Sequence, residues 1–282
     1  MQVFDLRSLL YIALVVLRYI FINSLNYFVQ IFFFKKSKKH SCCELGSLNG
    51  KSDKINFIGP FSKFINKNDN SIKSVLVLLR KLKLISSCYS VLVKKNIPVF
   101  AGLGGGTSNA FTVMKYVLRK KLSKKNLNII EKKIGSDLEL FFYKQGFLKN
   151  LGSIINQKIK QTFFFVLIKP PIKCSTQKIY SKIKKHSSRT VFNKRAVKKR
   201  SSFLNLLINS RNDLQSVVEK KYPRLKTILN NISLQKGCYF SRMTGSGSVC
   251  YGLFINQNSA KKARINLKKI YPKFWVSIAK TV

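Results

Sequence analysis

The chain has 282 residues, 45% of them hydrophobic, which excludes an intrinsically disordered polypeptide and supplies the core of one large domain or two ordinary ones. Its 54 Lys and Arg residues outnumber 9 Asp and Glu residues, and the formal net charge of +45 attracts nucleic acids, anionic lipids and phosphorylated ligands without specificity. The basic residues are spread along the whole chain, which favours compositional drift in an A+T-rich genome over a dedicated nucleic-acid-binding arm.

An apolar run at 8–17 is the first element of the chain, and a secretory signal or a membrane helix would also contain such a run. Arg18 interrupts the run, polar residues recur through 19–34, and no small-residue cleavage site is evident. We therefore expect two adjacent buried strands at 9–17 and 24–34, followed by a lysine-rich turn at 35–54.

From residue 71 onward, helix and strand patterns alternate in both halves of the chain. Patterns typical of helices occupy 71–85, 107–119, 126–133, 211–231 and 258–269. Apolar runs typical of strands occupy 88–93, 162–168, 237–242, 248–255 and 273–280. A boundary between two domains, 1–158 and 159–282, is expected just before the strand that Pro170 ends, because proline cannot continue a sheet ladder. The basic segment 184–202 is expected to form a loop or insertion.

A glycine-rich segment, Pro98-Val-Phe-Ala-Gly-Leu-Gly-Gly-Gly-Thr-Ser108, lies between a predicted strand and a predicted helix. Closely spaced glycines let backbone N–H groups turn toward an anion, and the positive end of the following helix faces the same point. The segment is not a P-loop, because no Gly-Lys-Ser/Thr follows, and it lacks the third glycine of the dinucleotide fingerprint. Phosphate is the expected ligand, and the alternative is a flexible loop capped by Ser108.

Two further motifs contain glycine beside small polar or acidic residues. The segment Met243-Thr-Gly-Ser-Gly-Ser248 lies between two predicted strands, where the alternative is a tight turn. Ile134-Gly-Ser-Asp137 places one of the nine acidic residues beside a glycine at the end of a predicted helix. The alternative for that motif is a helix C-cap followed by a surface aspartate.

The six cysteines and two histidines show neither a Cys-x-x-Cys pair nor a zinc-like spacing. We therefore expect reduced cysteines that lie in the core or on the surface as ordinary side chains. No protein-bound metal site is expected, and the expected location is the cytoplasm.

Taken together, these motifs resemble those of the GHMP kinases, which bind ATP through a glycine-rich loop unlike the P-loop. Within that superfamily they are most similar to the branch that phosphorylates a cytidine diphosphate ester of methylerythritol, in the non-mevalonate route to isoprenoids. The segment 98–110 resembles the family's phosphate loop, Asp137 its catalytic aspartate, and 243–254 its third motif. Other stretches agree in order and spacing: 167–172, Tyr180 and Asn212-Asp213-Leu214. The resemblance covers about residues 19–254.

The resemblance implies an α+β protein with the two-domain GHMP kinase fold: a ribosomal-protein-like N-terminal domain and an α/β-sandwich C-terminal domain. ATP would bind the loop, with Mg²⁺ neutralising its phosphates. The implied ATP-binding residues are Pro98, Gly102, Leu103, Gly104, Gly105, Gly106, Thr107 and Ser108. Asp137 would take the proton of the acceptor's 2-hydroxyl as that oxygen attacks the γ-phosphate.

The resemblance also assigns the acceptor site and a cationic partner for Asp137. Two aromatic side chains hold the cytosine ring in the family, and Tyr19 and Tyr180 fall at their positions, with a core strand residue as the alternative for Tyr19. The glycine segment would bind the acceptor through Gly245, Ser246 and Gly247. The family's N-terminal lysine is missing, and Arg7 is the nearest replacement, although its planar head is not an equal substitute.

Two other functions stay open at this point. The chain could be another GHMP kinase, acting on homoserine, mevalonate or a sugar, although Asn96-Ile-Pro98 and Lys169-Pro-Pro171 favour the cytidyl branch. It could also be a degenerate kinase fold retained as a basic RNA-binding protein. The favoured hypothesis is a cytoplasmic enzyme, monomeric or homodimeric, with a small cytidyl diphosphate substrate and neither a specific nucleic-acid partner nor a membrane partner.

Overall fold

The computed structural model describes residues 29–33, 47–48, 52–118, 122–142, 146–150, 153–156, 162–182 and 199–280. The chain forms two compact units, described separately below. The N-terminal unit comprises the described residues of Ser24–Val99 and Gly104–Phe142, and the C-terminal unit comprises those of Phe100–Leu103 and Tyr143–Val282. The strand expected at 9–17 lies outside the described residues. None of the helices in the described ranges is long and apolar enough to cross a membrane.

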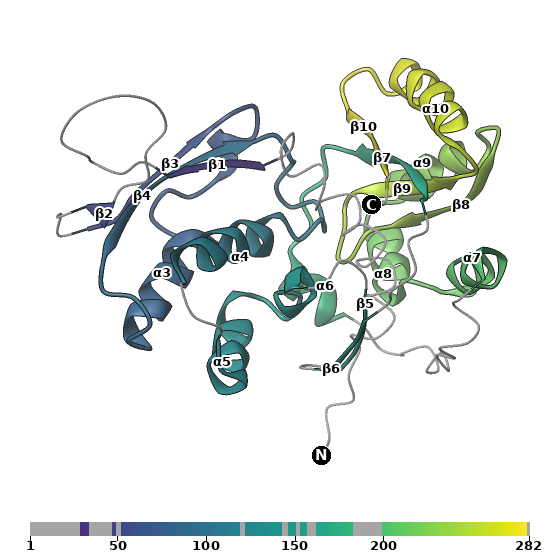
Figure 1. The fold of residues 1–282 in the computed structure, drawn as a ribbon. Coiled ribbons are helices and arrows are strands. Elements are labelled where there is room, and N and C mark those ends of the chain that lie inside the picture. The colour runs from purple at the N-terminus through teal and green to yellow at the C-terminus, as the bar shows by residue number, and fades with distance from the viewer. Residues whose placement is uncertain are drawn as a thin grey trace. The chain divides into compact units, whose positions relative to one another are not determined.

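The N-terminal unit is a small mixed sheet with helices (Figure 1). Strand β4 (Cys88–Lys95) pairs antiparallel with β1 (Val29–Phe33) and β2 (Ser47–Leu48), and parallel with β3 (Lys54–Ile58). Helix α3 (Ser71–Lys81) connects the parallel pair, as parallel strands require a crossover. The other elements are η1 (Ser62–Phe64), α4 (Gly105–Val117), α5 (Lys124–Ile134) and η2 (Glu139–Phe142).

Local signals in the sequence explain where two of these helices begin and end. The side chain of Asn70 accepts a hydrogen bond from Lys73 N and caps α3, and Ser123 caps α5 in the same way. The buried stripe of α3 consists of Ile72, Val75, Leu76 and Leu79. Helix α3 ends at Lys81 instead of the expected residue 85, because Lys83 has a positive φ of 54° that cannot continue a right-handed helix.

The C-terminal unit contains an antiparallel sheet in the order β10-β7-β9-β8 (Figure 1). Its strands are β7 (Phe164–Lys169), β8 (Cys238–Met243), β9 (Cys250–Phe254) and β10 (Trp275–Lys280). Helix α9 (Arg224–Ser233) packs on β8 and β9, and α10 (Gln257–Ile270) packs on β7 and β10, which gives a β-α-β-β-α-β order. The remaining elements are β5 (Gly146–Asn150), β6 (Ser153–Asn156), α6 (Thr176–Tyr180), α7 (Arg200–Asn209) and α8 (Asp213–Lys221).

Two helix predictions in this unit were wrong in detail. The single helix expected at 211–231 is two helices, α8 and α9, and Tyr222-Pro223 separates them because the residue before proline disfavours the helical region. Helix α7 begins at Arg200, inside the segment 184–202 that was expected to be a loop. The helix is short, and its apolar residues come directly after a run of basic residues. The sequence therefore shows no helical periodicity of apolar residues at its start.

Candidate active site

The first turn of α4, in the N-terminal unit, has a geometry that suits an anion. Gly104 is the N-cap residue of α4, with φ 61° and ψ 17°, and its carbonyl accepts the first helical hydrogen bond from Ser108 N at 2.9 Å. The N–H groups of the first turn have no intrahelical acceptor, and the helix dipole adds a partial positive charge there. Ser71 Oγ donates to Gly106 O at 2.7 Å and so fixes this turn against the start of α3.

A buried lysine adds a full positive charge at the same turn. Lys95 is the last residue of β4 and is only 2% exposed. A Cβ atom placed on Gly105 would lie 3.0 Å from Lys95 Nζ, and no described carboxylate lies within ion-pair distance of that nitrogen. Burial lowers the pKa of Lys95 to about 8. A buried cation beside the positive end of a helix is unfavourable unless an anion binds both, so the charges at this position are suited to an anionic ligand.

Sequence reasoning missed Lys95, although a signal was present. The buried side chains of β4 alternate, and Val91 and Val93 precede Lys95 at the same spacing. A lysine that continues an apolar alternation is expected to lie inside the protein.

Asp137 lies beside this turn, where the sequence analysis placed the catalytic aspartate. A Cβ atom on Gly104 would lie 3.0 Å from Asp137 Oδ2, and one on Gly135 would lie 2.8 Å from Asp137 Oδ1. Loss of hydration raises the pKa of Asp137, and a hydrogen bond from the Thr107 side chain opposes the rise. The structure therefore brings together Gly104, Thr107 and Asp137, all of which were predicted site residues.

Two other acids lie close to Asp137. Glu131 is 3% exposed, and burial, followed by the charge of Glu139, raises its pKa to about 7. Burial also raises the pKa of Glu139, and Glu131 Oε1 and Glu139 Oε2 lack hydrogen-bond partners within the described part of the chain. Burial thus shifts both groups toward the protonated form, and a protonated carboxyl adds no negative charge near Asp137.

The C-terminal unit contains the other half of the glycine-rich segment. Thr244 Oγ1 donates to Ala101 O at 2.9 Å, and Val249 N donates to the same oxygen at 3.3 Å. A Cβ atom on Gly102 would overlap the carbonyl oxygen of Thr244. The segments 101–102 and 244–249 therefore lie backbone against backbone, and this close approach requires glycine at position 102.

The remaining predicted residues occupy three different environments. Pro98, Leu103 and Ser108 are buried. Ser246 Oγ lies 2.9 Å from Thr176 Oγ1 at the start of α6, and Tyr180 is one helical turn further along α6 on the same face. Arg7 and Tyr19 lie outside the described residues. Within the ranges that the structure describes, no group of three His, Cys, Asp or Glu side chains is placed to hold a metal ion.

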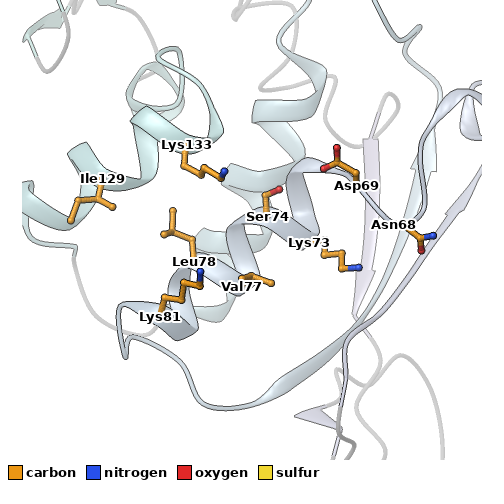
Figure 2. Close-up of a pocket in the computed structure, with 9 residues that line it drawn as sticks. All are labelled: Asn68, Asp69, Lys73, Ser74, Val77, Leu78, Lys81, Ile129 and Lys133. Carbon is orange, nitrogen blue, oxygen red and sulfur yellow. The ribbon is translucent and has the colours of Figure 1, made fainter.

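A groove of about 550 Å³ follows α3 and α5 in the N-terminal unit (Figure 2). Lys73, Lys81 and Lys133 line it together with the apolar side chains of Val77, Leu78 and Ile129. Asn68 and Asp69, which precede α3, lie at one end. The groove therefore combines three lysine side chains with an apolar lining.

Comparison with known protein families identifies both units. The family model for the N-terminal domain of GHMP kinases matches residues 70–143, and the model for the GHMP kinase C-terminal domain matches residues 198–273. A solved structure of 4-(cytidine 5'-diphospho)-2C-methyl-D-erythritol kinase has the same fold, with a TM-score of 0.60 at 20% identity over 82% of this chain and 83% of that one. These matches confirm the expected α+β fold of the GHMP kinases.

Curated relatives identify the family more narrowly than the fold does. The 4-diphosphocytidyl-2-C-methyl-D-erythritol kinase of Pelagibacter ubique (strain HTCC1062) is 36% identical over 248 residues, which are 86% of this chain and 87% of the relative. The kinase of the same name from Wolbachia sp. subsp. Drosophila simulans (strain wRi) is 32% identical over 79% of this chain and 78% of the relative. This chain therefore belongs to the 4-diphosphocytidyl-2-C-methyl-D-erythritol kinase family of the GHMP kinases.

Proposed function

We propose that this protein transfers the γ-phosphate of ATP to the 2-hydroxyl of 4-diphosphocytidyl-2-C-methyl-D-erythritol, a step in isoprenoid precursor synthesis. The relatives' names support the acceptor, and the kinase family supports the use of ATP. One structural observation supports the chemistry: the buried cation Lys95 and the carboxylate of Asp137 both lie against the first turn of α4. A cation that can bind a phosphate and a carboxylate that can act as a base therefore lie beside the same helical turn.

The first turn of α4 and Lys95 would hold the phosphates of ATP. Several N–H donors and a cation neutralise the negative charge that the γ-phosphate and its leaving group carry. Mg²⁺, when bound, would supply further charge neutralisation, held chiefly by phosphate oxygens and water.

Asp137 would act as the base. Its carboxylate accepts the proton of the 2-hydroxyl, the hydroxyl oxygen forms a bond to the γ-phosphorus, and the bond between that phosphorus and the β–γ bridging oxygen breaks to release ADP. A raised pKa makes an aspartate a stronger base, and the protonated Asp137 must then lose its proton to solvent before the next turnover.

We further propose that Gly245, Ser246 and Gly247 contact the acceptor and that Tyr180 stacks on its cytosine, with Tyr19 as the second aromatic and Arg7 as a cation near Asp137. The contact between Ser246 and the first turn of α6 supports a common site for the glycine segment and Tyr180. The four described cysteines are free thiols, which agrees with a cytoplasmic location.

Tyr180→Ala should raise the KM for the cytidyl substrate about tenfold and leave the KM for ATP unchanged, because stacking on a base contributes about 1–3 kcal/mol. Steady-state kinetics with each substrate varied in turn would measure both constants. An equal rise in the two constants would show that Tyr180 supports the fold instead of the base.

A coupled assay of ADP release tests the proposed reaction. With the cytidyl substrate, the protein should release ADP and form the 2-phosphate ester of that substrate. With homoserine, mevalonate or galactose, it should release no ADP. Activity only with another alcohol would identify a different GHMP kinase. Absence of activity with every alcohol, together with salt-sensitive RNA binding, would identify a degenerate kinase fold.

Lys95→Met should weaken ATP binding about 10–100-fold, as expected for loss of a hydrogen bond to a charged group. The melting temperature of the unliganded protein should stay equal or rise, because a buried charge with no ion-pair partner among the described residues is removed. Isothermal titration and thermal melting measure the two effects. Lys94→Met is the matched control, because Lys94 is the exposed neighbour on the same strand.

The pH dependence gives a second readout for the same lysine. Because the pKa of Lys95 is about 8, its charge is lost as the pH rises through 8, and ATP affinity should fall there. Lys95→Arg should remove that dependence, since arginine stays charged. Identical pH profiles in the two proteins would contradict a role for Lys95 in binding ATP.

A further inference from the structure

Asn212 is a buried polar side chain that connects three parts of the C-terminal unit. It is 6% exposed and immediately precedes α8. Its Oδ1 accepts from Leu214 N at 3.0 Å and caps α8. Its Nδ2 donates to Met243 O at 2.9 Å and to Gly245 O at 2.8 Å, on either side of Thr244. The cap and the two donated bonds come from different atoms of one amide.

The two donated bonds fix the backbone of the glycine segment at Thr244. Gln215 Oε1, one turn into α8, accepts from Met243 N at 2.9 Å and adds a third bond to the same stretch. Thr244 in turn donates to Ala101 O, three residues before Gly104. A chain of hydrogen bonds therefore runs from Asn212 through Thr244 to the start of the phosphate loop.

We propose that Asn212 is a positioning residue that, through Thr244, sets the backbone of the acceptor segment and of residues 101–102 together. Resting on the proposed function, this assignment makes the sites for acceptor and ATP energetically coupled: binding at one segment holds the other in its bound form. Loss of the Nδ2 donors releases both segments, so affinity for each ligand falls and the gain in ATP affinity produced by the acceptor disappears.

The substitution Asn212→Asp separates this role from helix capping. Aspartate keeps the Oδ1 acceptor and is an equally good N-cap residue, but it replaces the Nδ2 donor with an oxygen facing two carbonyl oxygens. Asn256 is the matched control, because it caps α10 through a bond from Ser259 N at 2.8 Å. Asn256→Asp adds the same charge and keeps the same type of cap without touching the glycine segment.

The measurement is the affinity for a non-hydrolysable ATP analogue with and without the cytidyl substrate. Asn212→Asp should weaken binding of each ligand at least about tenfold, as expected from losing two buried hydrogen bonds. The analogue should also bind this variant equally well with and without the cytidyl substrate, so that the ratio of the two affinities is one. Asn256→Asp should keep the wild-type ratio. As the pH falls and the introduced carboxyl protonates, it regains one donor, so binding to Asn212→Asp should partly recover, whereas binding to Asn256→Asp should not.

A second pair of variants tests the connection at Thr244. Thr244→Ser keeps the hydroxyl donor to Ala101 O, and Thr244→Val removes it at nearly constant volume. Two results would overturn the proposal. One is a wild-type ratio of analogue affinities in Asn212→Asp, and the other is an equal loss of analogue affinity in Thr244→Ser and Thr244→Val. Failure of the proposed function is a separate result, because wild-type protein would then release no ADP with the cytidyl substrate.

Discussion

Asp137→Asn should lower turnover by about 10²–10⁴-fold, the usual range for loss of a general base, while ATP affinity stays within a few-fold of wild type. The amide has nearly the shape of the carboxylate, so it keeps its place against Gly104 and Gly135 but does not accept the proton of the 2-hydroxyl. Single-turnover kinetics separate the chemical step from binding. In wild-type protein, turnover should rise with pH across the titration of Asp137, because only the ionised form accepts a proton.

Glu139→Gln is the matched control for this substitution. Glu139 is an acid two residues away whose pKa burial also raises, and it has no assigned contact with substrate. Its replacement should change turnover less than tenfold, within the ordinary effect of a nearby charge. Near-normal turnover in Asp137→Asn, or an equal loss in Glu139→Gln, would remove the assignment of Asp137 as the base.

Gly104→Val should abolish detectable ATP binding. Gly104 has φ 61°, a left-handed conformation that costs other residues roughly 1–2 kcal/mol and β-branched ones more. Its Cβ would also lie 3.0 Å from Asp137 Oδ2, so the substitution shifts both the carboxylate and the first turn of α4. Titration with ATP, together with circular dichroism to show retained structure, measures the effect.

Gly237→Val controls for backbone strain alone. Gly237 also has a positive φ, 82°, and a Cβ there would lie 2.7 Å from Ser259 Oγ, in the turn before β8. Both variants should melt at a lower temperature than wild type, but the folded Gly237→Val protein should bind ATP normally. Normal ATP affinity in Gly104→Val would show that phosphate does not approach this backbone.

Much of the fold was predictable from the sequence because local signals agree with the tertiary structure. Asn70 and Ser123 cap α3 and α5. Strand β7 appears as a continuous apolar run because successive side chains on both of its faces, Phe165 to Ile168, are buried. The start of α4 was placed two residues late. Thr107 and Ser108 are good N-cap residues, but the left-handed backbone of Gly104 starts the helix at Gly105, and propensity alone does not show that conformation.

Site residues that belong to contiguous sequence motifs were predictable. Residues whose role depends on their burial in the folded protein were not. Asp137 and Gly104 come from separate motifs that the structure brings together. Lys95 was missed because lysine is common in this sequence, and only its place inside the sheet distinguishes it. Asn212 was noticed as part of a motif, but its two bonds to Met243 and Gly245 join residues distant in the chain. The predictions for Arg7 and Tyr19 stay predictions.

The path of the chain through residues 100–103 affects how this enzyme can be divided or recombined. These four residues belong to the C-terminal unit, although the residues on both sides belong to the N-terminal unit. A polypeptide ending at residue 158 would leave Ala101 without the hydrogen bonds from Thr244 and Val249, and its phosphate loop would start from an unsupported backbone. An N-terminal half exchanged between two relatives would meet a foreign residue at position 244. Recombination within this family should therefore succeed most often when residues 100–103 and 243–249 are inherited from the same parent.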